Sequence, residues 1–169
     1  MRDTIKPIWR KNTYCSFCGH HFDKDQPWPR QCSHCQQLTY LNPIPVAVLL
    51  LPVGNGILTI RRNIEPRKGQ LALPGGFIDG TESWQSAAAR ELYEEAQIQI
   101  EPDQISLFQV HSAPDGTLLI FGLAPHYPEA TLPAFHPSAE ISDRVIIYGT
   151  HTLAFPLHTQ VTKAFFDQC

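Results

Sequence analysis

The chain of 169 residues is long enough for one medium-sized domain and a small appended unit. It is 43% hydrophobic, which permits a substantial core, and its formal net charge of −3 gives no basic field of the kind that favours nucleic-acid binding. No apolar run approaches the roughly 18 residues of a membrane span, and the N-terminus lacks the apolar stretch of a secretory signal. We therefore expect a cytoplasmic protein with neither nucleic acid nor membrane as a partner.

Two Cys-x-x-Cys pairs stand near the N-terminus, Cys15 with Cys18 and Cys32 with Cys35. Each pair offers two thiolates from one tight turn. Four thiolates complete a tetrahedral Zn²⁺ site with no open position, which is typical of a structural site. Two disulfides are the alternative, and a cytosolic setting disfavours them. Rival ligands are the neighbouring histidines His20, His21 and His34.

The cysteine pairs predict a first domain over residues 1–43, made of a lead-in, a zinc ribbon and a linker. Such a ribbon has little core of its own, so metal binding would supply much of its folding energy. In the lead-in, Trp9 is a candidate to pack on the ribbon, and prolines in segment 40–45 stiffen the linker. A second domain is expected over residues 44–169, with Cys169 left over as a free thiol.

The second domain opens with a continuous apolar run at residues 46–51, which predicts a buried strand. A Gly-Asn-Gly turn follows, so residues 57–62 are expected to pair back as a hairpin. Candidates for contacting a diphosphate are the basic residues Arg61, Arg62, Arg67 and Lys68. A solvated loop with charges at a strand end is the alternative for each of them.

A Pro-Gly-Gly turn, containing Gly75 and Gly76, leads into a predicted helix over residues 85–96. This segment has strong helix formers and neither glycine nor proline. Thr81 or Ser83 can cap its start through a hydroxyl oxygen. The sequence therefore predicts a tight turn followed directly by a regular helix.

Three carboxylates of this helix, Glu91, Glu94 and Glu95, are spaced i, i+3 and i+4 and so fall on one side. Close carboxylates repel one another, and a cation removes that cost. Oxygen ligands suit Mg²⁺ or Mn²⁺, which commonly bridge to substrate phosphates. Arg90 can hold a carboxylate in place with its planar guanidinium. Taken alone, this spacing also fits a solvated acidic face, and the surrounding motif favours the metal site.

The whole stretch resembles the Nudix hydrolase signature, in which a glycine, a glutamate, an Arg-Glu pair and a Glu-Glu pair stand in fixed order. The matching positions are Gly76, Glu82, Arg90, Glu91, Leu92, Glu94, Glu95 and Ile98. Gln97 departs from the pattern, which has a helix-ending glycine there, so we expect an effect on the local backbone and none on the catalytic groups. The ribbon also resembles the one that precedes the catalytic domain in some Nudix enzymes, including the NADH pyrophosphatase group.

Beyond the helix, apolar runs predict further strands at residues 98–100, 105–110, 117–123 and 140–148. Residues 125–137 hold four prolines and no periodicity, which indicates a long loop, and residues 156–167 read as a closing helix. These elements imply an α/β fold with a mixed sheet and helices on its faces. The Nudix resemblance makes it an α/β/α sandwich.

The resemblance implies hydrolysis of a pyrophosphate linkage in a nucleoside diphosphate derivative, with release of a nucleoside monophosphate. It assigns Mg²⁺ or Mn²⁺ to Glu91, Glu94 and Glu95, with a backbone carbonyl near Gly75 completing the coordination. Substrate binding is assigned to Arg61, Arg62, Gly75 and Gly76. A carboxylate must accept the water proton, and the candidates are Glu91 and Glu140, ahead of Asp143 and Glu129. A plain surface charge is the alternative for Glu140.

The sequence leaves the substrate open among ADP-ribose, NADH and FAD-like compounds. The NADH pyrophosphatase group carries a Ser-Gln-Pro-Trp-Pro-Phe-Pro-like segment downstream of the signature, and residues 109–116 here do not match it. Two other classes remain: a catalytically inactive, nucleotide-sensing Nudix module and a nucleic-acid adaptor that works through the ribbon. The full set of acids argues against the first, and the scarcity of basic residues in the ribbon argues against the second. Family members are often dimers, so a homodimer is among the expected states.

Overall fold

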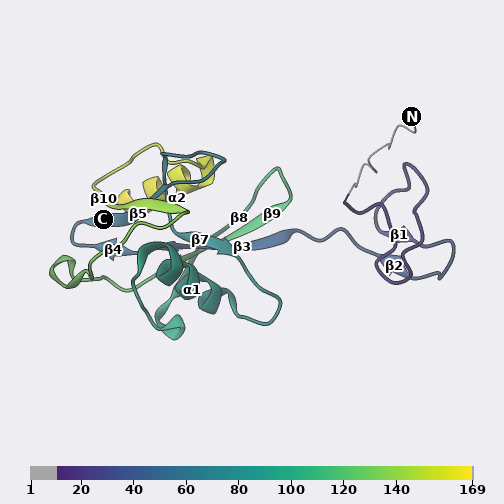
Figure 1. The fold of residues 1–169 in the computed structure, drawn as a ribbon, viewed down its shortest axis with the longest axis horizontal. Helices are drawn as coiled ribbons and strands as arrows, with labels where there is room; N and C mark the ends of the chain where they lie inside the picture. The colour runs from purple at the N-terminus through teal and green to yellow at the C-terminus, as the bar shows by residue number, and fades with distance from the viewer. Residues whose placement is uncertain (1–10, 169) are drawn as a thin grey trace, which may run out of the picture. The chain divides into compact units, whose positions relative to one another are not determined.

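The structure, a computed structural model, describes residues 11–168. It divides into two compact units, Met1–Pro43 and Ile44–Cys169 (Figure 1). The predictions made for Trp9 and Cys169 lie outside the described residues. Within the described part of the chain, no helix is long and apolar enough to cross a membrane.

The first unit is a small β-ribbon with two loops that carry the cysteines. Strands β1 (Arg30–Gln31) and β2 (Leu38–Thr39) pair antiparallel. Among its described residues, 11–43, the buried core consists of Cys15, Phe22 and Cys32, against which Trp28 and Cys35 pack. So few buried apolar groups in that range cannot fix a fold by themselves, as expected for a unit that depends on a metal.

The second unit contains two four-stranded sheets. In the mixed sheet, β3 pairs parallel with β9, while the β3–β7 and β8–β9 pairs are antiparallel. Its strands, in spatial order, are β7 (Gly75–Phe77), β3 (Ile44–Leu50), β9 (Thr117–Leu123) and β8 (Ser106–Ser112). The other sheet is antiparallel, and β5 pairs with each of the other strands. Its strands are β10 (Ile141–Ile147), β5 (Gly56–Arg62), β4 (Pro52–Val53) and β6 (Leu71–Ala72).

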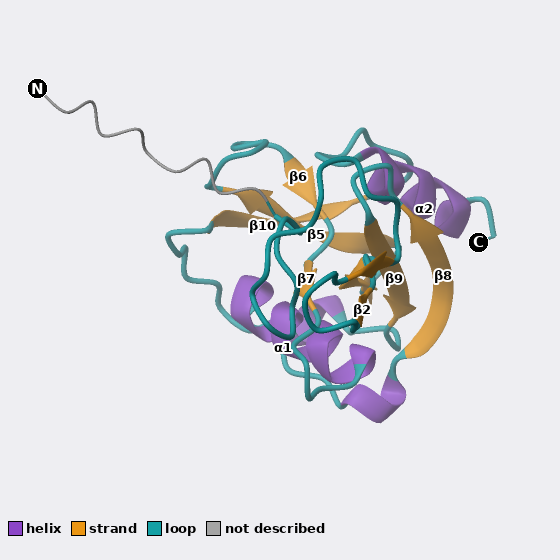
Figure 2. Ribbon diagram, turned by 90° about the vertical axis from the view of Figure 1, so that its right-hand side faces the viewer, coloured by secondary structure: helices purple, strands orange, loops and turns teal. Residues whose placement is uncertain are grey.

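Two helices, α1 (Trp84–Ala96) and α2 (Pro156–Phe166), lie on opposite sides of these strands (Figures 1 and 2). Helix α1 buries Ala88 and Leu92 in one core cluster, and α2 buries Val161 in a second. The arrangement is the predicted α/β fold with a mixed sheet and helices on both faces.

The surroundings of strand β3 explain the unbroken apolar run at residues 46–51. Ala47 and Leu49 point into the core cluster on the α1 side, whereas Val48 and Leu50 point into the cluster on the α2 side. All four side chains are at most 1% exposed. A strand covered on both faces has no reason to alternate with polar residues, and the predicted buried strand is confirmed.

Two predicted strands differ from the structure. The hairpin across the Gly-Asn-Gly turn joins β5 only to the two-residue β4, and the long partner of β5 is β10. The chain crosses from one sheet to the other between Leu50 and Pro52, a switch that no local pattern marks.

Residues 98–100 are not a strand, because Ile98 fills the core as the chain leaves α1, ahead of the 3₁₀ turn Pro102–Gln104. The loop over 125–137 is confirmed and contains a second 3₁₀ turn, Glu129–Thr131.

Candidate active site

Gly75 and Gly76, which the sequence predicts as a tight turn directly before the helix, instead lie in strand β7, where they pair with Val48 and Ala47 of β3. A Cβ atom on Gly76 would lie 2.2 Å from Glu91 Oε1, and one on Gly75 would lie 2.4 Å from the carbonyl oxygen of Ala47. Both positions therefore require glycine. Without side chains there, β7 can lie against strand β3 on one side and against a carboxylate of α1 on the other.

The start of α1 is fixed by a side-chain cap. Of the two predicted caps, Ser83 fills the position, and its hydroxyl accepts the backbone N–H of Ser86 at 3.1 Å. Just before it, Glu82 Oε1 accepts the N–H of Asp79 at 2.9 Å. The loop between β7 and α1 is thus closed by Glu82, which also faces Arg90.

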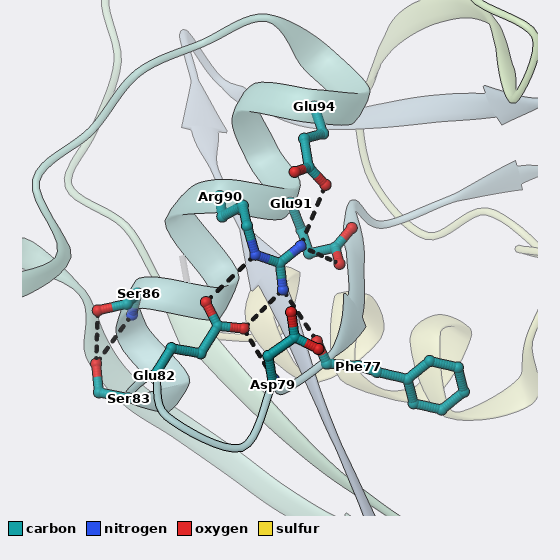
Figure 3. A network of polar contacts seen from close by, with 8 residues as sticks. All are labelled: Phe77, Asp79, Glu82, Ser83, Ser86, Arg90, Glu91 and Glu94. Atoms are coloured by element: carbon teal, nitrogen blue, oxygen red, sulfur yellow. Dashed lines mark hydrogen bonds and ion pairs between the residues drawn. The ribbon is translucent and has the colours of Figure 1, made fainter.

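Arg90 joins the signature residues into one network (Figure 3). Its guanidinium donates to Glu82 Oε1 at 2.7 Å, to Glu91 Oε1 at 2.8 Å and to Glu94 Oε2 at 3.1 Å. A further N–H donates to the carbonyl oxygen of Phe77 at 3.0 Å. Its hydrogen bonds with Glu82 and then Glu91 raise the pKa of Arg90, and Arg90 in turn lowers the pKa of Glu82. One planar cation thereby connects the helix face, the loop before it and strand β7.

The carboxylates of the helix experience different environments. Burial raises the pKa of Glu91, although Arg90 acts in the opposite direction. Burial also raises the pKa of Glu95 to about 8, with a smaller contribution from the nearby charges of Glu91 and Glu140. The N–H of Gly75 donates to Glu95 Oε2 at 2.9 Å and favours the ionised form. Glu94, by contrast, has a side chain that is 53% exposed.

The three helix glutamates and Glu140 line one cavity of about 320 Å³. Its other lining residues are Ser138, Ala139 and Ile141. Glu140 arrives from the loop before β10, and its carbonyl oxygen accepts the N–H of Asn63 at 2.6 Å. The structure therefore brings a fourth acid, distant in sequence, to the carboxylates of α1.

The two predicted substrate-binding arginines have different surroundings. Arg61 donates to the carbonyl oxygen of Gly69 at 3.0 Å and lies 3.9 Å from Asp143. Arg62 donates to Pro66, and its charge lowers the pKa of Glu95. Of the pair, Arg62 is therefore electrostatically coupled to the acidic cavity.

The sequence did not predict the role of a histidine that bonds the backbone just before β7. His158 of α2 is buried, and its Nδ1 accepts the N–H of Leu73 at 3.2 Å. Burial lowers its pKa to about 3, so the ring stays neutral and keeps an acceptor nitrogen for this bond. The partners are 85 residues apart, and a single histidine in a helix gives no local signal of such a role.

The acidic cavity has the chemistry of a divalent-cation site. Its ligand atoms are carboxylate oxygens, which Mg²⁺ and Mn²⁺ prefer. Glu95 is held in a setting that disfavours its charge, and the carboxylates of Glu91 and Glu140 add to that cost. A cation bound among them would reverse the sign of these interactions. The residues present therefore fit such an ion.

The cysteines fit a Zn²⁺ ion in their geometry as well as in their chemistry. The four Sγ atoms lie within 4.8 Å of one another, with 3.7 Å between Cys15 and Cys35 and 3.6 Å between Cys18 and Cys32. Four sulfurs at about 2.3 Å from a zinc ion would stand about 3.8 Å apart, whereas a disulfide needs about 2.05 Å. His20 instead stacks on His34, with ring centroids 5.3 Å apart.

Comparison with known proteins agrees with this geometry. The profile of the NUDIX domain matches residues 41–148, and the chain belongs to the Nudix family. Among curated relatives, the NAD-capped RNA hydrolase NudC of Edwardsiella ictaluri is 32% identical over 98 residues, which cover 57% of this chain and 38% of that protein. NudC of Escherichia coli K12 is 29% identical over the same length. The chain thus matches less than half the length of these relatives.

Solved structures show the same fold. A NUDIX hydrolase from Nitrosomonas europaea superposes with a TM-score of 0.73 at 24% identity, over 92% of this chain and 91% of that one. A bifunctional NMN adenylyltransferase/ADP ribose pyrophosphatase from Francisella tularensis, complexed with AMP and a manganese ion, gives a TM-score of 0.63 at 26% identity. That match covers 75% of this chain and 42% of the other.

Proposed function

We propose that this chain hydrolyses a pyrophosphate linkage in a nucleoside diphosphate derivative, in a reaction that depends on a divalent metal. The observation that carries the proposal is the cavity shared by Glu91, Glu94, Glu95 and Glu140, beside the two glycines of β7 and braced by Arg90. In the reaction, the oxygen of a water molecule forms a bond to one phosphorus. The bridging P–O bond breaks, its oxygen leaves with the other phosphate, and a carboxylate accepts the proton that water loses.

The chain's own residues have separate tasks in this scheme. Glu91, Glu94 and Glu95 would hold Mg²⁺ or Mn²⁺, with a backbone carbonyl near Gly75. Such an ion, when bound, neutralises phosphate oxygens and lowers the pKa of water. Arg90 keeps Glu91 and Glu94 oriented, because its rigid fork donates to both.

Two carboxylates remain candidates for the proton acceptor. Glu91 is half-buried and already accepts a hydrogen bond from Arg90 Nη1. Glu140 lines the same cavity from the loop before β10. A general base needs a position within hydrogen-bond reach of the attacking water, and both residues border the space where that water would lie.

The names of the compared proteins support a substrate class. NAD-capped RNA and ADP-ribose, which appear in two of these names, both contain a pyrophosphate that joins adenosine to a second ribose. We therefore propose a compound in which a pyrophosphate joins adenosine to a second sugar or a ribityl group, either free (ADP-ribose, NADH or an FAD-like molecule) or, in the case of NAD, at the 5′ end of an RNA. The RNA substrate runs against our expectation that nucleic acid is not a partner. Arg62 is the basic residue best placed to meet the phosphates, given its electrostatic coupling to Glu95.

A substrate panel tests the proposal. The protein is incubated with Mg²⁺ or Mn²⁺ and with ADP-ribose, NADH, FAD or a 5′-NAD-capped RNA, and products are separated by chromatography. We expect release of a nucleoside monophosphate from at least one of them, and its loss in Glu95→Gln. A folded protein that binds one of these compounds without cleaving it would contradict the proposal and favour the sensing module.

A further inference from the structure

The end of helix α1 departs from the Nudix pattern, and the departure strains the backbone. Gln97 stands where the pattern has glycine, and it adopts the left-handed conformation with φ 56° and ψ 35°. Its backbone N–H donates to the carbonyl oxygen of Tyr93 at 2.9 Å and closes the helix. A residue with a Cβ atom is strained in this conformation, and glycine is not. The strain points to a role for the side chain.

The Gln97 side chain makes a two-point hydrogen bond to a backbone segment 39 residues away. Its Nε2 donates to the carbonyl oxygen of His136 at 2.8 Å, and its Oε1 accepts the N–H of His136 at 2.9 Å. The amide thus pairs with both polar groups of one peptide residue, as a neighbouring strand would. Glycine at this position could make neither bond.

Arg144 of β10 makes a second connection between the same two segments. Its guanidinium donates to the carbonyl oxygen of Ala96 at 2.9 Å and to that of Pro133. It also lies 5.6 Å from the ring centroid of Phe135. The loop over 133–136 is therefore fastened to the end of α1 at two places.

This loop leads directly to the fourth acid of the cavity. After His136, the hydroxyl of Ser138 accepts the N–H groups of Glu140 at 3.2 Å and Ile141 at 3.0 Å. Asn63 donates to the carbonyl oxygens of Ser138 and Glu140. Glu140 is thus held from one side by Asn63 and, through the loop, from the other side by Gln97.

We propose that Gln97 is a positioning residue that places Glu140 at the acidic cavity by fastening the 133–136 loop to the C-terminal end of α1. The proposal rests on the proposed function, since Glu140 matters only if the cavity hydrolyses a substrate. It explains why a strained glutamine replaces glycine. The strain at one backbone position is offset by two hydrogen bonds that fix the loop.

The first test measures the loop without any substrate. Amide hydrogen exchange followed by mass spectrometry is compared in the full chain with wild-type Gln97, Gln97→Gly and Gln97→Asn. Glycine removes the strain and both bonds; asparagine tolerates the left-handed conformation but is one methylene too short to pair with His136. We expect faster exchange over residues 133–141 in both variants, with no loss of melting temperature in Gln97→Gly. Unchanged exchange would overturn the proposal.

The second test asks whether Gln97 acts through Glu140. We expect Gln97→Gly and Gln97→Asn to lower kcat about 10- to 100-fold on whichever panel compound is cleaved, with a smaller change in KM. In the Glu140→Gln background, Gln97→Gly should cause little further loss. Equal losses in both backgrounds, or full activity of Glu140→Gln, would overturn the proposal. A wild-type protein that cleaves nothing would refute the proposed function instead, and the exchange data would still decide whether Gln97 holds the loop.

Discussion

Glu95 is the helix carboxylate whose surroundings differ most from water. Burial and the neighbouring acids Glu91 and Glu140 raise its pKa to about 8, and the N–H of Gly75 offsets only part of this. Near neutral pH and without a cation, the neutral form is therefore favoured. The fold holds this side chain in a setting where a bound cation would favour its charged form, as the proposed metal site requires.

The first prediction concerns the stability of Glu95→Gln without added Mg²⁺. Because the folded-state pKa is raised from 4.5 to about 8, wild-type folding loses stability as pH rises through this window: the unfolded chain ionises there and the folded chain does not. The glutamine variant does not titrate, and its Oε1 can still accept from Gly75. Its free energy of unfolding relative to wild type should thus rise with pH, by on the order of 3–5 kcal/mol in total.

Urea unfolding from pH 4.5 to 8.5 measures this difference. Glu94→Gln is the matched control, because its side chain is 53% exposed on the same helix. A difference between Glu95→Gln and wild type that stays constant with pH would show that burial does not set the ionisation of Glu95.

At the scale of elements, α1 is organised by a cation on its own surface. Arg90 donates to Glu82 before the helix, to Glu91 and Glu94 within it, and to the carbonyl oxygen of Phe77 in β7. Like-charged glutamates at this spacing would otherwise weaken the helix. The arginine therefore offsets the repulsion between these glutamates and connects the helix to β7.

The second prediction is that Arg90→Lys keeps the positive charge and loses the site geometry. A lysine ammonium cannot bond Glu82, Glu91 and Phe77 in one plane. We expect kcat to fall about 10- to 100-fold and the free energy of unfolding to fall by about 1.5–3 kcal/mol. Steady-state kinetics and urea titration measure the two effects. The control is Arg30→Lys, since Arg30 stacks on Trp28 in the other unit. Normal kinetics for Arg90→Lys would contradict this role.

The elements themselves were largely predictable, and the exceptions have physical causes. The predicted helix over 85–96 and the strand over 117–123 agree with α1 and β9, because apolar patterning and helix caps are local signals. Two features could not be read locally: the crossing of the chain from one sheet to the other after Leu50, and the irregular conformation of residues 98–100, which were predicted as a strand. Both depend on contacts with distant parts of the chain. Ile98 is apolar because it fills the core at the end of α1, and not because it belongs to a sheet.

At the scale of the whole molecule, the chain combines a unit with a large core and a unit whose described residues, 11–43, have a very small one. Residues 44–169 have two buried clusters, whereas the first unit has a core of Cys15, Phe22 and Cys32. The sulfur spacing of 3.6–3.7 Å suits a zinc ion. The stability of the first unit should therefore depend on metal, and that of the second should not.

The third prediction is that Cys32→Ser loses zinc and unfolds the first unit alone. Zinc content is measured by atomic absorption, and hydrogen exchange by mass spectrometry. Exchange should increase over residues 11–43 and remain unchanged over 44–168. Cys169→Ser is the control, because Cys169 belongs to neither cysteine pair. Full zinc content in Cys32→Ser would show that this cluster does not hold the ion.

The site was predictable only where its residues are close in sequence. The signature acids and Arg90 lie in α1 and in the short loop before it, so their spacing can be recognised in the sequence. The bonds from Leu73 to His158 and from Gln97 to His136 span 85 and 39 residues, and neither histidine stands in a motif. Glu140 was proposed from the resemblance, and only the fold shows that it borders the same cavity.

The most direct measurement is of Mn²⁺ binding to the wild-type chain and to Glu95→Gln at pH 8, with electron paramagnetic resonance as the method of detection. The account predicts that wild type binds Mn²⁺ and that Glu95→Gln weakens binding by at least about tenfold, because a carboxylate of the cavity is lost. Absence of binding in wild type, or equal binding in both proteins, would contradict the assignment of these carboxylates to a divalent metal.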